Sequence, residues 1–510
     1  MFPRPVLFIN PKASLLSWPS PPRAVEPLGI LCTAAAFRER GVETSIIDLD
    51  LHNNHEHLLR TLRLGEFGLV GIAMTSQMQV WDGFRVARDV KCMCPNAEIV
   101  VGGIFATMNS QWILDTCPEI DGVCRGEGEM LAHCYVDDPG PLSRLPNVLD
   151  RSELSVLTSA PRLPKYAATM DEYPWPARDL LPTVLRRGEL PSIVTSRGCG
   201  ATCSFCAIPA FSGMLWRMRS PSRIVDEIRQ LHQDYGARRF HLIDDNLFGH
   251  TDESYRKAMQ LLDDLAAMPE DLKFRAACRF DDLTSEALAK VKASGITLLK
   301  LGVETLGEAT QRHYHKLLPE DLVAGRMQDI LRAGIGISLG FIMFDPFCDL
   351  ASVRRNFEFL LAFPDCWSRH LLRSRLEAYA GTAIEQRIWK AGLGLSRSAF
   401  GTRWKFQDEE VNAFHDRFEQ AARSVLLPVE WNFYYVWQQN ANERAGLTHE
   451  LSPADLREID GRIRVLSTEL FKQALANQNP LPSNSLTQSA AELQAELESL
   501  VQGVDCYAVH

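Results

Sequence analysis

The sequence lacks several features that would place it in other classes of protein. It has no apolar run of membrane-spanning length, and its start, MFPRPVLFIN, lacks the charged leader and long apolar core of a signal peptide. The net charge is −10, and the absence of long runs of one sign argues against a broad nucleic-acid-binding face. We therefore expect a cytoplasmic protein with no membrane span and no nucleic-acid partner.

The spacing of a disulfide framework is also missing. The 13 cysteines are an odd number scattered through a large chain, which in a reducing compartment argues against structural disulfides. We expect most of them, including Cys32, Cys117 and Cys134, to be small buried apolar residues. With 510 residues the chain is too long for one compact core, so we expect several domains.

The first part of the chain, residues 1–137, alternates short apolar runs with helical patterns. Strands are predicted at PVLFIN, ETSIIDL, FGLVGIAM and AEIVVGG, and helices at 28–40 and 80–92. This alternation is typical of an α/β fold with a parallel sheet covered on both faces, whose ligands sit beyond the carboxyl ends of the strands. The small or polar residues predicted at those ends are Asn10, Thr75, Ser76, Gly102, Gly103, Gly126 and Glu127.

The rest of the chain divides into three segments. Repeated prolines in residues 138–191 break any long helix, so we expect an ordered connector there. Residues 192–400 return to six longer strand–helix units, which predict a partial (β/α)6 TIM-like barrel with its chemistry at the carboxyl ends of the strands. Residues 401–510 predict a helical C-terminal domain. Its aromatic cluster, Trp431–Trp437, is open to two interpretations, core packing or a wall of the substrate pocket.

Three cysteines stand together in TSRGCGATCSFCAIP, directly after the apolar run SIVTS: Cys199, Cys203 and Cys206. Three thiolates on a short loop can hold three irons of a [4Fe–4S] cubane and leave the fourth iron open to a substrate. Phe205 can cover such a cluster. Zinc is the weaker alternative, because no second cysteine pair or suitable histidine follows within this unit.

The stretch CGATCSFC is similar to the CxxxCxxC signature of the radical S-adenosylmethionine (SAM) superfamily, and the resemblance covers about residues 191–393. It implies a [4Fe–4S] cluster whose open iron is chelated by SAM, a 5′-deoxyadenosyl radical that abstracts hydrogen from an unactivated carbon, and an external electron donor of the flavodoxin or ferredoxin type. The family's other strand-end motifs imply cofactor contacts at further positions. These are Asp244 and Asp245 in HLIDDNLFG, Glu304 in LKLGVET, Tyr379 in EAYAGTA and, as the weaker candidate, Arg279 on the third strand.

The N-terminal part resembles the cobalamin (B12)-binding domain found ahead of the barrel in one radical SAM subgroup. The matching pieces are EPLGILCTAAAFRERGVETSIIDLD, EIVVGGIFAT and VCRGEGE. The resemblance implies a Rossmann-like, flavodoxin-like domain with cobalamin across its strand ends. A DxHxxG motif is missing, since the first strand runs into INPKAS, but the subgroup usually lacks that histidine too. The residues implied as contacts are Thr75, Ser76, Gly102, Gly103 and Gly126, with Gln77 and Met78 near the lower cobalt face and Glu127 beside them.

This layout implies a class B type radical SAM methyltransferase. It would move a methyl group through methylcobalamin to an unactivated carbon of a small or carrier-bound natural-product intermediate, as in antibiotic biosynthesis. We expect a monomer. Three alternatives stay open: a radical SAM enzyme that does not methylate (a cyclase, ring contraction or dehydration), a cofactor-binding sensor with a degenerate barrel, and a methylthiotransferase. The last fits less well, because the expected extra cluster cysteines and the β-barrel tail are missing from the sequence pattern.

Overall fold

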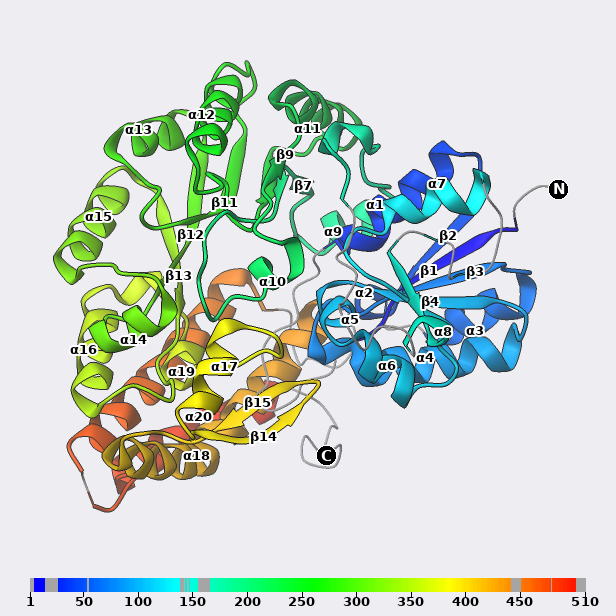
Figure 1. The fold of residues 1–510 in the computed structure, drawn as a ribbon. Coiled ribbons are helices and arrows are strands. Elements are labelled where there is room, and N and C mark those ends of the chain that lie inside the picture. Colours follow the sequence, from blue (N-terminus) through cyan, green and yellow to red (C-terminus); the bar gives the residue numbers. More distant parts are fainter. Residues whose placement is uncertain are drawn as a thin grey trace.

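The computed structural model describes residues 4–13, 26–52, 55–137, 142, 145, 147–154, 166–441, 451–477 and 479–500. Two parallel sheets, each with helices packed on it, lie side by side, and a layer of C-terminal helices covers the second (Figure 1). Among the helices within these ranges, none combines the length and apolar composition needed to cross a membrane.

The first sheet has the strand order β2-β1-β3-β4-β5-β6, and all its neighbours are parallel except β5 and β6. The order of its first five strands is that of flavodoxin-like folds, as expected from the sequence. Strand β1 is buried along its whole length because helices cover both faces. The strands are β1 (Val6–Asn10), β2 (Thr44–Asp48), β3 (Leu69–Ala73), β4 (Glu98–Gly102), β5 (Gly122–Cys124) and β6 (Val148–Asp150).

Helices flank this sheet on both sides. Phe8 packs with α1 in one apolar core, whereas Leu7 and Ile9 pack with α4 in the other, because alternate side chains of a strand point to opposite faces. Figure 1 shows α1 and α7 above the sheet and α3, α4 and α6 below it. These helices are α1 (Leu28–Glu39), α3 (His55–Leu64), α4 (Val80–Met93), α5 (Ile104–Met108), α6 (Ser110–Thr116) and α7 (Glu129–Asp137), with the short α2 at Leu49–His52.

The segment predicted as a connector contributes to the first sheet. Strand β6 pairs antiparallel with β5, and the short helices α8 (Arg151–Leu154) and α9 (Leu181–Arg186) follow it. The remainder of the prediction for 138–141, 143–144, 146 and 155–165 lies outside the described residues.

The second sheet has the parallel order β13-β12-β11-β10-β7, the sequential order of a barrel wall. The sixth unit is reduced. The run HLLRSRLE (370–377), where its strand was expected, begins inside the 3₁₀ helix η5 (Arg369–Arg373), and an isolated parallel bridge joins Phe344 to Arg375. The strands are β7 (Ser192–Val194), β10 (Arg239–Ile243), β11 (Lys273–Arg279), β12 (Ile296–Glu304) and β13 (Gly336–Phe341).

The barrel helices follow their sequence signals. In α11 (Pro221–Tyr235), proline fills the first turn, Ile224 and Ile228 are buried, and Gly236 ends the helix with φ 67°. Ser220 stands at the N-cap position but makes no side-chain cap bond. The other helices outside the sheet are α12 (Asp252–Ala266), α13 (Ser285–Ala293), α14 (Glu308–Tyr314), α15 (Glu320–Arg332) and α16 (Leu350–Ala362).

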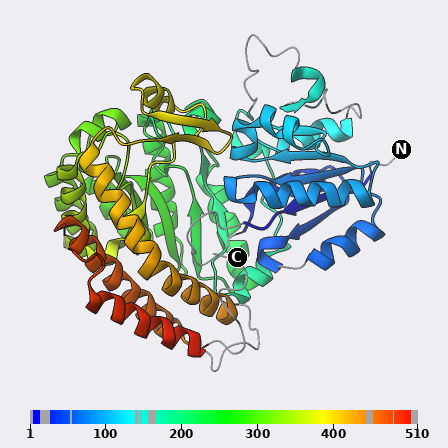
Figure 2. The same cartoon turned by 90° about the horizontal axis from the view of Figure 1, so that it is seen from below.

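The C-terminal region begins with helix α17 and a hairpin that spans the predicted boundary at residue 400. Three long helices then pack along the outside of the barrel (Figure 2). Helix α20 starts at Asn484, so most of the Ser-, Asn- and Gln-rich segment 481–489 is helical. The elements are α17 (Ala383–Lys390), β14 (Gly394–Ser398), β15 (Gly401–Trp404), α18 (Glu409–Ala441), α19 (Pro453–Leu475) and α20 (Asn484–Leu500).

The aromatic cluster Trp431–Trp437 lies on α18. Phe433 and Val436 are buried in the main core, and the side chain of Trp437 packs against it. The indole of Trp431 is half-buried and contacts Tyr434. Phe433 and Val436 lie one turn apart on the same buried face of α18. Their burial supports core packing over the pocket-wall interpretation.

Candidate functional site

The three predicted cluster cysteines lie on one loop at the carboxyl end of the barrel. The loop lies between β8 (Ser196–Arg197) and β9 (Arg217–Met218), which pair antiparallel. Cys199 and Cys203 are buried, and Cys206 is half-buried in the same small apolar cluster. Gly198 has φ 85°, and a Cβ there would lie 1.8 Å from the carbonyl oxygen of Leu215. Only glycine therefore fits where the chain enters the loop.

The surroundings of the thiols suit a metal cluster. Arg279, on β11, donates from Nη1 to Cys203 Sγ at 2.7 Å and from Nη2 to Asp281 at 2.6 Å. Burial raises the pKa of the Cys206 thiol to about 12 and also raises that of Cys199, so without metal these thiols hold their protons at neutral pH. Thiolates are the ligands of iron–sulfur clusters, and binding would displace those protons. A guanidinium beside three buried thiols fits an anionic cluster.

The aspartates after β10 have two different environments. Asp245 Oδ2 accepts a hydrogen bond from Gly198 N at 2.8 Å, so Asp245 holds the entry of the cysteine loop. Asp244 Oδ1 accepts from the hydroxyls of Thr195 and Ser196. Its Oδ2 is buried and has no hydrogen-bond partner among the described residues. Burial raises the pKa of Asp244 to about 7. A buried carboxylate oxygen left without a donor suits the ammonium group of a ligand.

Glu304 ends β12 in an unusual backbone conformation. Its φ is 69°, and the pairing of β12 with β13 shifts register between Gly302 and Glu304. The carboxylate folds back over Gly302, where a Cβ would lie 2.2 Å from its Oε1. There it accepts from Lys316 Nζ at 3.1 Å, and the Lys316 side chain is 5% exposed. The lysine, which no motif predicted, holds Glu304 at the barrel mouth.

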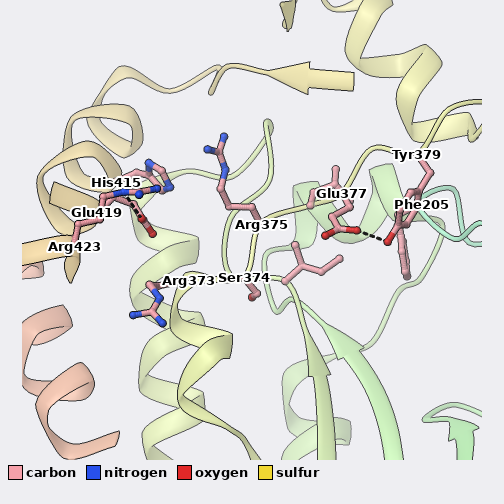
Figure 3. Close-up of a pocket in the computed structure, with 11 residues that line it drawn as sticks. Phe205, Arg373, Ser374, Arg375, Glu377, Tyr379, His415, Glu419 and Arg423 are labelled. Atoms are coloured by element: carbon pink, nitrogen blue, oxygen red, sulfur yellow. Dashed lines mark hydrogen bonds and ion pairs between the residues drawn. The ribbon is translucent and has the colours of Figure 1, made fainter. Parts of the chain in front are cut away.

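A cavity of about 690 Å³ opens beside the cysteine loop. Phe205 enters its wall from the loop, and Tyr379, whose hydroxyl donates to Glu377, stands next to it (Figure 3). The opposite wall comes from α18 and includes His415. None of the described residues that line the cavity belongs to the aromatic cluster on α18. Two predicted site residues, Phe205 and Tyr379, therefore meet at this cavity.

The first domain reaches this cavity through the predicted Gln77. This residue opens a 3₁₀ turn after β3, and its Nε2 donates to Glu377 Oε1 at 3.4 Å. The side chain of Gln79 holds this turn in place. Its Oε1 accepts hydrogen bonds from both the backbone N and the hydroxyl of Thr75, and its Nε2 donates to Asn10 Oδ1 at 2.7 Å. The strand ends of the two sheets thus face each other.

The other predicted strand-end residues line the edge of the first sheet. Gly103 has φ 114°, and a Cβ there would lie 2.8 Å from the carbonyl oxygen of Met74, so the β3 and β4 ends approach as closely as backbones can. Gly126 N donates to the hydroxyl of Thr107 at 3.0 Å. Such an edge of small residues fits the approach of a large flat ligand. Half-buried positions along it are Ser76, Met78, Gly102, Gly103 and Gly126.

Glu127 lies in a cluster of charged side chains at the junction of the two domains. Its Oε1 is 2.9 Å from Arg197 and 2.6 Å from Arg217, and its Oε2 accepts from the Tyr173 hydroxyl at 3.0 Å. Both oxygens are therefore occupied by protein donors. The side chain joins the first domain to the β8–β9 hairpin, and its expected contact with the cofactor stays a prediction.

Sequence reasoning missed several residues that shape the site. Gln79 and Lys316 carry no motif, because their roles depend on contacts made in three dimensions. His415 lies in a helix far from the cysteine loop in sequence, and Arg375 lies where a strand was predicted. Arg375 lies near the end of the run expected to form the sixth strand. That strand-end position was the sequence signal that could have identified it.

Family models place both cofactor-binding domains on this chain. The B12 binding domain model matches residues 21–134, and the Radical SAM superfamily model matches residues 193–348. An uncharacterized methyltransferase from Pyrococcus horikoshii is 27% identical over 285 residues, 55% of this chain and 61% of that protein. The hopanoid C-3 methylase of Methylococcus capsulatus is 31% identical over 217 residues, 41% of each chain. The chain thus spans less than two thirds of these relatives.

One further relative and two solved structures are also similar to this chain. An anaerobic magnesium-protoporphyrin IX monomethyl ester cyclase from Synechocystis sp. is 24% identical over 328 residues, 61% of this chain and 63% of the cyclase. The cobalamin-dependent SAM radical enzyme OxsB, with aqua-cobalamin bound, superposes with a TM-score of 0.73 at 16% identity, covering 97% of this chain and 76% of OxsB. The methyltransferase TsrM from Kitasatospora setae gives 0.62 at 17% identity, with 77% and 76% covered. With both family models matched in this order, the chain belongs to the radical SAM superfamily, in the subgroup that carries an N-terminal B12-binding domain.

Proposed function

We propose that this chain is a cobalamin-dependent radical SAM methyltransferase acting on an unactivated carbon of a small or carrier-bound substrate. The observation that carries the proposal is that both predicted cofactor sites adjoin one cavity. Phe205 comes to its wall from the cysteine loop, and Glu377 in the same wall is bonded to Gln77 of the B12-binding domain. Methyl transfer to a carbon needs the two cofactors and the substrate within reach of one another.

The chain's own groups have separate tasks in this proposal. Cys199, Cys203 and Cys206 hold the cluster, and Asp244 and Glu304 bind the polar groups of SAM. When bound, the cluster and SAM supply a 5′-deoxyadenosyl radical and cobalamin supplies the methyl group. The strand ends of the first domain hold the corrin through backbone contacts beside small residues. Phe205 and Tyr379 wall the cavity and limit the access of bulk water to the reacting groups.

The experiment that tests the proposal follows the fate of SAM. Protein purified without oxygen is reconstituted with iron, sulfide and hydroxocobalamin, desalted, and given a reductant and SAM with a deuterated methyl group. Transfer of the methyl leaves S-adenosylhomocysteine, whereas reductive cleavage leaves methionine and 5′-deoxyadenosine. We expect stoichiometric cobalamin, both products, and deuterium on the retained cobalamin.

Because one similar protein is named as a cyclase, the test also has to distinguish methyl transfer from a reaction without methylation. A radical SAM enzyme that does not methylate would form 5′-deoxyadenosine without S-adenosylhomocysteine. That result, or failure to retain cobalamin with the cluster intact, would overturn the methyltransferase proposal and favour a rearrangement or cyclisation. An external donor of the flavodoxin or ferredoxin type would take the place of the chemical reductant in the cell.

A further inference from the structure

The wall of the cavity carries an arginine that is held without an anionic partner. Arg375 follows η5 at the position of the missing sixth strand. Its guanidinium lies 4.3 Å from the ring centroid of Trp404 and 5.3 Å from that of Phe406. Within the described ranges its side chain makes no hydrogen bond and no ion pair at contact distance. Glu419, in the same cavity wall, and Asp416 attract it only through space, and Glu419 is itself 3.9 Å from Arg423. The two rings fix the cation by its face and leave its N–H donors free for another group.

The other charged groups of this wall already have partners. Arg373 donates to both carboxylate oxygens of Glu430 at 2.9 and 2.7 Å. Glu377 accepts from Gln77 and from Tyr379. Arg375 differs from these groups because only aromatic faces contact its charge. In Figure 3 its guanidinium projects between the α18 residues on one side and Glu377 on the other.

A histidine beside this arginine has a free ring nitrogen. His415, on α18, is 6% exposed and lines the same cavity. Its Nε2 is buried and has no hydrogen-bond partner among the described residues. Its ring lies 5.0 Å from Phe344 and 5.1 Å from Phe406, centroid to centroid. A buried polar atom of this kind is normally satisfied, so a ligand is the natural partner for Nε2.

The protonation state of His415 agrees with its place beside a cation. Burial, and then the charge of Arg375, lower the pKa of His415 to about 4. The imidazole is therefore neutral at physiological pH and carries one N–H. Its Nδ1 lies 3.5 Å from Asp416 Oδ1, a long contact that leaves the choice of tautomer to the ligand, and an anion selects the tautomer in which Nε2 carries the proton and donates. Arg375 and His415 together present a fixed cation and a neutral donor to one place.

We propose that Arg375 and His415 bind an anionic group of the substrate, a carboxylate or a phosphate ester. This rests on the proposed function, in which the cavity holds the substrate. A guanidinium fork matches the geometry of both anions, and its stacking on Trp404 and Phe406 reduces the entropy lost on binding. Phe205 and Leu376 provide apolar surface for the rest of the molecule. An anchored anion would direct the reacting carbon toward the cysteine loop.

The test measures binding rather than turnover, because the substrate is unidentified. Three probes share a benzene ring and differ in charge: phenyl phosphate, phenylacetate and benzyl alcohol. Their dissociation constants are measured by calorimetry on the reconstituted full-length protein. We expect at least one anion to bind about tenfold or more tightly than the alcohol, as a charge-assisted bidentate contact does. A preference for phenyl phosphate indicates a phosphate ester, and one for phenylacetate indicates a carboxylate.

Variants assign this preference to the two residues. Arg375→Gln should abolish it, Arg375→Lys should keep part of it, and His415→Phe should reduce it several-fold while preserving a ring. Arg256→Gln, an exposed arginine on α12, should bind all three probes as the wild type does. Cobalamin and iron content report whether each variant has folded. If Arg375→Gln fails to fold, Arg375→Lys and His415→Phe decide.

Two results would overturn the proposal: equal binding of the three probes by the wild type, or an unchanged preference for anions in the folded variants. Both are independent of SAM cleavage. Failure of the methyltransferase proposal is seen instead as missing S-adenosylhomocysteine, so the two failures are distinguishable.

Discussion

Arg197 and Glu127 form an ion pair of 2.9 Å that joins the two domains two residues before Cys199. The Glu127 side chain is only 4% exposed, and Arg217 binds the same oxygen at 2.6 Å. A short antiparallel hairpin holds both arginines next to the cysteine loop. Largely buried charges therefore hold the two domains together beside the cysteine loop.

Removing the shared carboxylate should destabilise the junction. Glu127→Ala leaves Arg217 with a charge that is nearly buried and uncompensated, which typically costs about 3–5 kcal/mol. We expect the free energy of unfolding in urea to fall by about that amount and cobalamin retention to fall with it. Glu39→Ala, at an exposed position on α1, should change stability by less than about 0.5 kcal/mol. Equal stability of the two variants would show that the ion cluster does not hold the domains together.

Loss of one cluster cysteine should abolish the radical reaction. In Cys203→Ala only two of the three thiols remain, and Arg279 loses its partner at 2.7 Å. We expect no iron–sulfur absorption and no 5′-deoxyadenosine from SAM after reconstitution. Cys92→Ala, at an exposed free cysteine, is the matched control and should keep both. Production of 5′-deoxyadenosine by the Cys203 variant would contradict the assignment of the loop.

Local patterns were enough to predict the parts of the site that depend on chain position. The three cysteines share a loop because only six residues lie between Cys199 and Cys206, whatever the surrounding fold. Asp244 and Glu304 were found because strand ends can be read from the end of an apolar run. The α/β alternation predicted the parallel sheet, and the resemblance to the cobalamin-binding domain implied its flavodoxin-like arrangement.

Contacts between distant segments could not be predicted in this way. Gln77 and Glu377 are 300 residues apart, and nothing in either local sequence indicates the other. The same holds for Arg375 and His415, whose functions depend on how α18 packs on the barrel. The sixth strand was overpredicted because HLLRSRLE has the apolar content of a strand, while the structure forms the 3₁₀ helix η5 there. The ion pairs of Glu127 with Arg197 and Arg217 were missed because strand-end position alone does not reveal an ion partner.

Glu304 is paired with Lys316, so variants at the two positions can separate the structural role of Glu304 from its role in SAM binding. Glu304→Ala should weaken SAM binding while sparing the cluster, and it should also lower stability by about 3–5 kcal/mol, because the nearly buried lysine loses its counter-ion. The double variant Glu304→Gln with Lys316→Met removes both charges. We expect it to recover most of the stability but none of the SAM affinity, as measured by urea unfolding and equilibrium dialysis. Recovery of SAM affinity would show that Glu304 acts only through the lysine.

Asp244 should make the stability of the protein depend on pH. Burial raises its pKa from 3.8 to about 7, so the native carboxyl keeps its proton to a higher pH than the unfolded one. Ionisation is then disfavoured in the native state, and this unfavourable contribution grows from about pH 4 to pH 7 and is constant above. Asp244→Asn should therefore gain stability relative to the wild type between pH 5 and pH 8, by a few kcal/mol, because a tenfold change in a proton-binding constant corresponds to about 1.4 kcal/mol. A difference independent of pH would exclude a carboxyl with a raised pKa.

The same titration should control SAM binding in the opposite direction. Only the ionised carboxylate of Asp244 attracts an ammonium group, so the affinity of the reconstituted wild type for SAM should rise between pH 6 and pH 8. Asp244→Asn should bind SAM at least about tenfold more weakly at pH 8, because a neutral amide replaces a charged acceptor. The variant's affinity should also vary less with pH. Dialysis against labelled SAM at several pH values checks both statements, and equal slopes for the two proteins would remove Asp244 from the SAM site, leaving its buried Oδ2 to another partner.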